Sequence, residues 1–589
     1  SYGKKGDAVV QMNWKAIDAG VDAVHKVNVP ESWHNPAPDA APKALKGPDA
    51  LVKQIRDVME PISRMDGDSL PVSAFEGNVN GEWEQGASAY EKRGTAVMVP
   101  EWDAEKCIQC NQCAFVCSHA TIRPFCLTAD EAANAPESTK LADTKPKAGE
   151  YKFTMAVSPL DCMGCGECVT VCPTKAIEMK PQESQAAQQA AFDYCVENIR
   201  KKDNIPGVVS DISVKGSQFN QPLLEFSGSC AGCAETSYAR LITQLFGEKM
   251  FISNATGCSS IWGGTASISP YTTNKESGFG PAWINSLFED NAEHGLGMQI
   301  GYETVRANLI TKVEALKGKN ADLDAVIDKY LETKNNTKAN DAPAKALIAA
   351  LEACGCDESK EILKDKQYLA KKSFWIFGGD GWAYDIGYGG LDHVLASGHD
   401  VNVMVFDTEM YSNTGGQASK ASNIGEVCQF AAAGKEISKK SLAEICMTYG
   451  YIYVAQIALG ANMAQAVKAI AEAEAYPGPS IIIGYAPCEL HGVKGGMTNC
   501  QNEMKKAVEA GYWNLFTFNP ANKAQGKNPF TLTSKAVDAE KYQALLANET
   551  RYSRLTRAFP DRAKQLFARN EQVANDRYEH LTRLVELYK

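Results

Sequence analysis

Phe374–Gly381, with the sequence FWIFGGDG, is an apolar run that ends in a glycine-rich turn. A second apolar run, Val401–Phe406, leads directly into the polar residues Asp407 and Thr408. From about Val208 onward, short apolar runs of this kind alternate with helical stretches such as Met463–Ala475. Such alternation predicts an α/β domain with a mostly parallel sheet that is covered by helices.

The Gly-Asp-Gly turn at Gly379–Gly381 has the composition of a phosphate and metal site. Glycines let the backbone approach a phosphate, and Asp380 offers a hard oxygen to Mg²⁺. Ligands of parallel α/β sheets bind at the carboxyl ends of the strands, where this turn is expected. A tight turn without a ligand has the same composition. Together with the polar end of the second strand, however, the turn resembles the metal-diphosphate motif of thiamine-dependent enzymes.

Two cysteine runs between Glu101 and Pro181 share the spacing C-x2-C-x2-C-x3-C. This spacing is typical of ferredoxins with two 4Fe-4S clusters, in which the fourth cysteine of each run binds the other cluster. Zinc sites, the alternative, usually combine two separated C-x2-C pairs. The predicted ligands are Cys107, Cys110, Cys113 and Cys172 for one cluster, and Cys162, Cys165, Cys168 and Cys117 for the other.

Several cysteines lie outside these runs. Cys230 and Cys233 form another C-x2-C pair, and their spacing alone leaves zinc and iron-sulfur sites open. We interpret the following as packed, structural or incidental thiols: Cys126, Cys195, Cys354, Cys356, Cys428, Cys446 and Cys500. His491 could act as an acid or base, but a hydrogen-bonded structural histidine is an equally good interpretation.

The composition excludes some classes of function. A formal net charge of -11 argues against nucleic acid as a partner, because a duplex binder needs a basic surface. No apolar run is long enough to cross a bilayer, and the start of the sequence lacks the pattern of a secretory signal. We therefore expect a cytoplasmic enzyme or carrier without a membrane partner. The 19 cysteines then indicate metal or redox chemistry, because the reducing cytosol seldom sustains disulfides.

Three segments together carry a resemblance to a known family. They are DTEMYSNTGGQ at Asp407–Gln417, SCAGCAE at Ser229–Glu235 and NATGCSSIWGG at Asn254–Gly264. The combination closely resembles pyruvate:ferredoxin oxidoreductases, and the resemblance covers essentially the whole chain.

The resemblance implies a set of site residues. Mg²⁺ would be held by the side chains of Asp380 and Thr408 and by the carbonyl of Met410, and Asn413 would face the reacting carbons as the catalytic residue. A third 4Fe-4S cluster would be bound by Cys230, Cys233, Cys258 and Cys488. Thiamine diphosphate would be contacted by Glu235, Cys258, Gly379, Asp380, Gly381, Trp382, Thr408 and Asn413.

The implied reaction is the oxidative decarboxylation of pyruvate with coenzyme A to acetyl-CoA and CO₂. Electrons would pass through three 4Fe-4S clusters to ferredoxin or flavodoxin, since the clusters are one-electron carriers. Two alternatives remain open: an oxidoreductase for another 2-oxoacid, and a non-catalytic electron-transfer subunit.

The implied reaction also needs a partner. In this family, the carboxylate that acts on the aminopyrimidine comes from a separate pyrimidine-binding domain, and no segment here resembles that domain. The chain also begins with Ser1 instead of methionine. We therefore expect a carboxyl-terminal half that associates with an amino-terminal half, as a subunit or a cleavage product, in a homo-oligomeric assembly.

A chain of 589 residues predicts two or three domains. We expect residues 1–76 to be the tail of a preceding domain and a linker, because Ser1–Gly86 is rich in Pro, Ala and Gly and reads as a connector. Residues 77–203 would form the ferredoxin-like module with two clusters. Residues 204–589 would form the thiamine-diphosphate and Mg²⁺ domain, with a helical insertion at about 302–372 and an amphipathic helical segment after Arg551 on its solvated outside.

Overall fold

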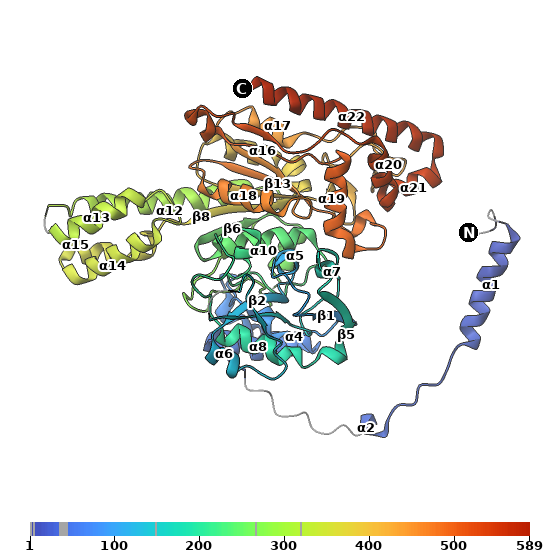
Figure 1. The fold of residues 1–589 in the computed structure, drawn as a ribbon, viewed down its shortest axis with the longest axis horizontal. Coiled ribbons are helices and arrows are strands. Elements are labelled where there is room, and N and C mark those ends of the chain that lie inside the picture. The colour runs from blue at the N-terminus through green and yellow to red at the C-terminus, as the bar shows by residue number, and fades with distance from the viewer. Residues whose placement is uncertain (1–2, 4–5, 35–44, 148–149, 266–267, 319–320) are drawn as a thin grey trace. The chain divides into compact units, whose positions relative to one another are not determined.

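The structure, a computed structural model, describes residues 3, 6–34, 45–147, 150–265, 268–318 and 321–589 (Figure 1). The chain divides into two compact units, Ser1–Val52 and Lys53–Lys589. The first unit contains helix α1 (Asp7–Asp22), none of whose residues is buried, and the short helix α2 (Glu31–His34). The predicted connector thus includes a regular helix, which ends before Pro30. The helix-breaking residues Pro36, Pro38 and Pro42 lie outside the described residues.

The larger unit is built on an eight-stranded sheet with the order β15-β14-β12-β13-β9-β8-β6-β7. Its strands are β6 (Met250–Asn254), β7 (Ala282–Asn285), β8 (Ser373–Gly379), β9 (Asn402–Asp407), β12 (Tyr453–Ile457), β13 (Ser480–Tyr485), β14 (Phe516–Phe518) and β15 (Phe530–Leu532). The six strands from β12 to β7 run parallel, and β14 and β15 add an antiparallel edge. The predicted α/β class with a mostly parallel sheet is confirmed.

Helices cover this sheet because its central strands are apolar on both faces. Every residue of β9 and β13 is buried, as expected for parallel strands between two helical layers. Figure 1 shows α16 (Tyr388–Ala396) and α17 (Leu442–Met447) on one side of the sheet and α10 (Ala234–Phe246) on the other. The helix predicted at Met463–Ala475 is α18, with the same bounds.

The Lys/Glu/Ala-rich segment forms the helices α12 (Asn291–Glu314), α13 (Ala321–Thr333), α14 (Asp341–Cys354) and α15 (Asp357–Leu363). These helices enclose an apolar core of their own, which includes Leu309, Ile327 and Leu347. The first turns of α12 pack on β6 and β8, before the predicted start of the insertion. This helix therefore joins the inserted core to the sheet.

The cysteine-rich segment forms a small two-part module. Strand β1 (Met98–Trp102) pairs with β5 (Ile177–Pro181), and β2 (Ile122–Leu127), β4 (Lys152–Val157) and β3 (Ala142–Asp143) form a second small sheet. The third cysteine of each run lies in a short helix, α5 (Gln112–Val116) or α7 (Glu167–Thr170), and the two helices pack together. This packing brings the two cysteine runs side by side.

The chain ends in the helices α19 (Cys500–Ala510), α20 (Ala539–Asn548), α21 (Thr550–Ala558) and α22 (Pro560–Leu587). The last two are amphipathic, as predicted, but α21 also turns the buried side chain of Arg551 into the domain. Among the helices that the structure describes, none combines the length and apolarity that a membrane span requires.

Candidate functional site

The three donors that the resemblance assigns to Mg²⁺ converge at the carboxyl ends of β8 and β9. These strands are parallel neighbours, so the turns that follow them meet at one edge of the sheet. The hydroxyl Oγ1 of Thr408 lies 2.9 Å from Asp380 Oδ1 and 3.0 Å from the carbonyl oxygen of Met410. A carboxylate and a carbonyl thus both lie within hydrogen-bond distance of one hydroxyl, although the three groups come from two separate segments.

The electrostatics of these donors fit a hard cation. Burial, and then the charge of Asp407, raise the pKa of Asp380 well above its ordinary value. A divalent cation would offset this cost of ionisation, and Mg²⁺ prefers oxygen ligands. The second carboxylate oxygen, Oδ2, accepts a hydrogen bond of 2.6 Å from Ser419 Oγ, which fixes the orientation of Asp380. In the described ranges, no three His, Cys, Asp or Glu side chains converge as ligands of a single ion.

A buried network of charges supports the loop that presents these donors. Glu409, which lies between Thr408 and Met410, has a positive φ of 61° and is completely buried. It pairs with Arg551 Nη1 at 2.9 Å and with Lys439 Nζ at 3.1 Å. Against the effect of burial, Lys439 and Arg551 lower the pKa of Glu409 to about 2. The left-handed loop residue is therefore held by two cations that the sequence reasoning missed.

His491 supports the same loop. Its Nε2 lies 2.7 Å from the carbonyl oxygen of Thr408, and burial lowers the pKa of its imidazole to about 3. A neutral, fully buried ring that bonds to a backbone carbonyl has a structural role. Of the two interpretations of His491, the geometry favours the structural one.

The predicted glycines have different surroundings. A Cβ atom at Gly381 would lie 2.6 Å from the ring of Tyr411, so packing inside the protein excludes a side chain there. A Cβ at Gly379 would meet only the carbonyl oxygen of Phe406, at 3.9 Å. The ring of Trp382 is completely buried and packs against Gly378 and Gly387, so it belongs to the core.

The structure brings the first two predicted cysteine quartets together. The four cysteines of the first quartet line one small cavity. Burial, and then the charges of Cys110, Cys107 and Cys172, raise the pKa of the Cys113 thiol. Burial, and then the charges of Cys165, Cys117 and Cys162, raise the pKa of the Cys168 thiol. In each quartet, the fourth cysteine comes from the other run, which is the exchange that the spacing predicts.

Backbone amides point at several of these sulfurs. Gly164 N lies 3.3 Å from Cys162 Sγ, and Ala176 N lies 3.2 Å from Cys172 Sγ. Amide donors to cluster sulfurs raise the reduction potential by stabilising added negative charge. The small residues near the cysteines thus place donors where a cluster would need them.

The third predicted quartet lies beside the loop Thr408–Ser412, which carries two of the donors predicted for Mg²⁺. Burial, and then the charges of Glu235, Cys233 and Cys488, raise the pKa of the Cys258 thiol. Asn413 has the opposite effect and lowers the pKa of the Cys258 thiol, so it lies close to this cysteine. Burial raises the pKa of Cys488 to about 11, with Cys230 among the neighbours that contribute. The four cysteines and the catalytic candidate Asn413 therefore share one region.

Two further residues lie near both the third quartet and the loop at Thr408. Ser412 Oγ donates a hydrogen bond of 2.7 Å to Thr408 Oγ1, and Ser412 also lowers the pKa of the Cys488 thiol, against the larger effect of burial. Glu235 is buried, its Oε2 has no hydrogen-bond partner, and burial raises its pKa to about 7. A buried carboxyl oxygen without a partner fits a polar ligand.

The cysteines outside the three predicted quartets differ in how deeply they are buried. Those with buried side chains are Cys126, Cys195, Cys428, Cys446 and Cys500. Cys354 is exposed, and its Sγ lies 3.2 Å from that of Cys356. Cys500 differs from the rest because members of two quartets are its neighbours.

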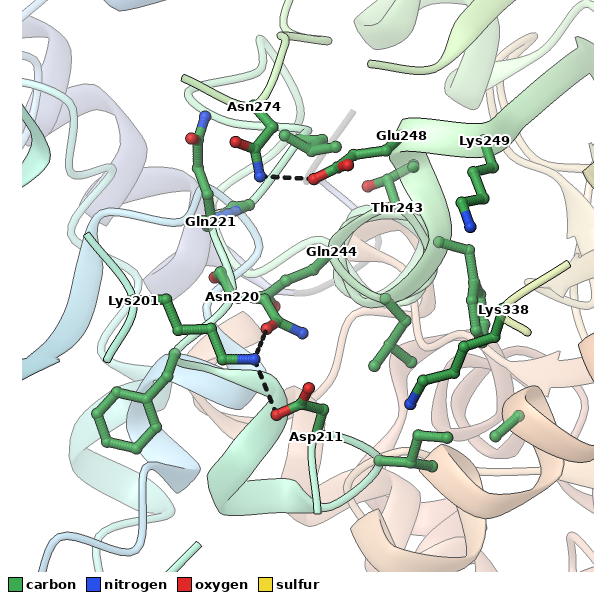
Figure 2. A pocket seen from close by; sticks show the side chains of 18 of the residues that line it. Lys201, Asp211, Asn220, Gln221, Thr243, Gln244, Glu248, Lys249, Asn274 and Lys338 are labelled. Atoms are coloured by element: carbon green, nitrogen blue, oxygen red, sulfur yellow. Dashed lines mark hydrogen bonds and ion pairs between the residues drawn. The ribbon is translucent and has the colours of Figure 1, made fainter. Parts of the chain in front are cut away.

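A large cavity of about 1100 Å³ lies elsewhere, between the cysteine module, α10 and the loop before α14 (Figure 2). Among the residues labelled in Figure 2, Lys201 Nζ bonds to Asp211 at 2.9 Å and to Asn220 at 2.8 Å, and Asn274 bonds to Glu248 at 2.6 Å. No predicted cluster, magnesium or thiamine residue is among the described residues that line it. The site predicted from the sequence is therefore separate from this cavity.

Comparison with known proteins identifies three segments. Residues 106–176 match a 4Fe-4S dicluster domain, and residues 363–483 match the C-terminal TPP binding domain of thiamine pyrophosphate enzymes. Residues 39–96 match EKR, a domain of unknown function.

Similar proteins cover the whole chain. A pyruvate-flavodoxin oxidoreductase of Enterobacter agglomerans is 48% identical over 99% of this chain and 50% of its own length. A pyruvate:ferredoxin oxidoreductase of Moorella thermoacetica is 48% identical over 100% of this chain and 50% of its own length. The chain is homologous to about half of the length of each of these oxidoreductases. The mitochondrial pyruvate dehydrogenase [NADP(+)] of Euglena gracilis is 43% identical over 99% of this chain and 32% of its own length.

The resemblance predicted from the three segments is thereby confirmed. The iron-sulfur and thiamine-diphosphate domains of pyruvate-flavodoxin and pyruvate:ferredoxin oxidoreductases are present in this chain. The chain spans about half the length of the relatives that it matches.

Proposed function

We propose that the chain is the thiamine-diphosphate-binding and electron-transfer half of an oxidoreductase that converts pyruvate and coenzyme A to acetyl-CoA and CO₂. Electrons leave through three 4Fe-4S clusters to ferredoxin or flavodoxin. The observation that carries this proposal is the convergence of Asp380, Thr408 and the Met410 carbonyl beside a third cysteine quartet. The names of the relatives support pyruvate as the substrate.

The residues have distinct roles in this proposal. Asp380, Thr408 and the Met410 carbonyl hold Mg²⁺, and Asn413 contacts the reacting carbons next to Cys258. Bound thiamine diphosphate would supply an electron sink for the carbanion that decarboxylation produces. The buried Glu235 carboxyl lies in the same region and has an oxygen available for the cofactor.

The three cysteine quartets hold the clusters. The first consists of Cys107, Cys110, Cys113 and Cys172, the second of Cys117, Cys162, Cys165 and Cys168, and the third of Cys230, Cys233, Cys258 and Cys488. Three one-electron carriers suit this reaction because oxidation of a 2-oxoacid releases two electrons.

The proposed activity needs a partner. The relatives are about twice as long as this chain, which leaves room for the pyrimidine-binding domain. We propose that an amino-terminal half supplies that domain and its carboxylate, and that the complete assembly is a homo-oligomer.

The test is turnover by the complete assembly, prepared without oxygen, with pyruvate or 2-oxoglutarate, coenzyme A and an electron carrier. We expect acetyl-CoA and CO₂ to form together with reduced ferredoxin or flavodoxin. Preference for 2-oxoglutarate would refute pyruvate as the substrate. Tight binding of thiamine diphosphate without turnover of either acid would instead indicate an electron-transfer subunit.

A further inference from the structure

A short segment of the thiamine domain, Met497–Gln501, lies against the loop of the second cysteine quartet. It consists of the short helix η11 (Met497–Asn499) and the first residues of α19, and α7 packs on both. Thr170 Oγ1, in the cysteine module, lies 2.9 Å from the carbonyl oxygen of Glu167 and 3.2 Å from that of Thr498, so its hydroxyl can donate to either. A Cβ atom at Gly166, between Cys165 and Cys168, would lie 2.9 Å from Thr498 Oγ1. A side chain at position 166 would therefore displace Thr498 Oγ1, and the positive φ of 82° at Gly166 adds backbone strain.

The same segment also lies against the loop of the third quartet. Gly232 lies between Cys230 and Cys233 and has a positive φ of 75°. A Cβ at this position would lie 3.0 Å from the carbonyl oxygen of Met497 and 3.1 Å from its Cβ. Each of two cysteine loops therefore contacts consecutive residues of one segment through a glycine.

Buried polar groups fill the rest of this junction. Gln501 Nε2 donates a hydrogen bond of 3.2 Å to Glu167 Oε1, and both side chains are buried. Cys500 is fully buried, and burial followed by the charges of Glu167 and Cys233 raises the pKa of its thiol, with Cys165 contributing further. The Cys500 thiol thus has one member of the second quartet, Cys165, and one member of the third, Cys233, as neighbours.

The packing gives this segment a geometric role. Protein interiors are close-packed and transmit changes in volume, so a side chain added at a glycine contact moves the loops apart. We propose that Met497–Gln501 is a spacer that fixes the separation between the second and third cysteine quartets, and with it the coupling between the groups they hold. This inference rests on the proposed three clusters and adds positioning residues that bind none of them.

The test uses the complete assembly, reduced with dithionite under anaerobic conditions, and measures the spin-spin interaction between clusters by electron paramagnetic resonance. Gly166→Ala should weaken the interaction because the new methyl group meets Thr498 Oγ1. Gly166→Ala combined with Thr498→Ala should recover part of it, because the remaining Thr498 Cβ lies 3.7 Å from the added atom. The control is Gly450→Ala, which has a similar positive φ of 75° but no atom within 4 Å of the added Cβ.

A second variant leaves the cysteine loops untouched. Thr498→Ile enlarges the spacer from the side of the thiamine domain and should weaken the same interaction, even if Gly166→Ala fails to assemble its cluster. Iron and sulfide analysis accompanies each measurement. An unchanged interaction in Thr498→Ile with all three clusters present would overturn the spacer. Fewer than three clusters in the parent protein would instead refute the proposed function on which it rests.

Discussion

Arg551 Nη1 lies 2.9 Å from Glu409 Oε2, and both side chains are almost completely buried. Glu409 is flanked by Thr408 and Met410, so this ion pair joins helix α21 to the loop that presents two of the three donors proposed for Mg²⁺. Arg551 also pairs with Glu549 at 2.6 Å and with Glu426 at 3.4 Å. A single guanidinium thus lies within 4 Å of three buried carboxyl groups, and of these only Glu409 has a lowered pKa.

We predict that Arg551→Met destabilises the domain and weakens the binding of thiamine diphosphate with Mg²⁺. Removal of one partner of a buried ion pair leaves an uncompensated charge and costs about 3–5 kcal/mol. In this variant Glu409 keeps its ion pair with Lys439, but Glu549 loses its ion pair with Arg551. The loop therefore loses part of its support. Thermal unfolding and calorimetric titration with the cofactor would measure both effects.

Arg557→Met is the matched control for this variant. Arg557 lies on the same helix but is exposed, so its replacement should change neither quantity appreciably. If Arg551→Met bound the cofactor as tightly as the parent protein, the network would have no role in positioning the loop.

Replacement of the Asp380 carboxylate should weaken binding of the cofactor without destabilising the fold. Asp380→Asn keeps the size of a completely buried side chain and removes a charge that burial disfavours, so the fold should remain. Loss of a charged interaction with Mg²⁺, at about 1.5–3 kcal/mol, should weaken binding of the cofactor about ten- to hundredfold. Titration with thiamine diphosphate at several Mg²⁺ concentrations checks this. Asp392→Asn, on α16, serves as the control, and an unchanged Mg²⁺ requirement in Asp380→Asn would argue against the donor set.

The cluster assignment predicts which cysteine is needed for which cluster. Cys172 belongs to the second run in the sequence but neighbours Cys113 of the first run. Cys172→Ser should therefore remove the first cluster and about one third of the iron, because three equal clusters share it. Cys126→Ser, at a buried thiol outside the quartets, should keep all the iron. Iron analysis and electron paramagnetic resonance distinguish the two, and full iron content in Cys172→Ser would contradict the assignment.

Local patterns were sufficient to predict the sheet, and they also predict how the cysteines group into quartets. Strand β8 is an apolar run bounded by a glycine turn, and both features are visible in consecutive residues. The exchange of Cys117 and Cys172 between quartets follows from a spacing that itself reflects how a loop wraps a cluster. Where neighbouring residues determine the geometry, the sequence is enough.

Long-range pairs could not be predicted in this way. Arg551 stands at the start of an amphipathic helix among exposed arginines, and nothing nearby in the sequence indicates that it turns inward to meet Glu409. The sequence indicates only a structural or incidental role for Cys500, although the fold places it near members of two quartets. Such roles depend on which elements pack together, which is a property of the whole domain.

The pH dependence of stability should contain a contribution from Glu474 on α18. Burial raises its pKa from 4.5 to about 7, while Ser373 Oγ and Trp375 Nε1 bond to the carboxyl group at 2.5 and 3.1 Å. Between pH 4.5 and about pH 7, the Glu474 carboxyl has lost its proton in the unfolded chain but keeps it in the folded chain. The contribution of this group to stability is therefore fully present below pH 4.5 and is lost as the pH rises through about 7.

Glu474→Gln removes the ionisation and should therefore be more stable than the parent protein at higher pH. The gain should be small at about pH 5 and grow to at most about 3 kcal/mol at about pH 8, since one pKa unit corresponds to about 1.4 kcal/mol. Apparent unfolding temperatures measured across this range would show the divergence. Glu472→Gln, on the same helix, is the control for the substitution itself and is measured across the same pH range. A constant difference between Glu474→Gln and the parent across the range would mean that Glu474 is already ionised in the folded protein.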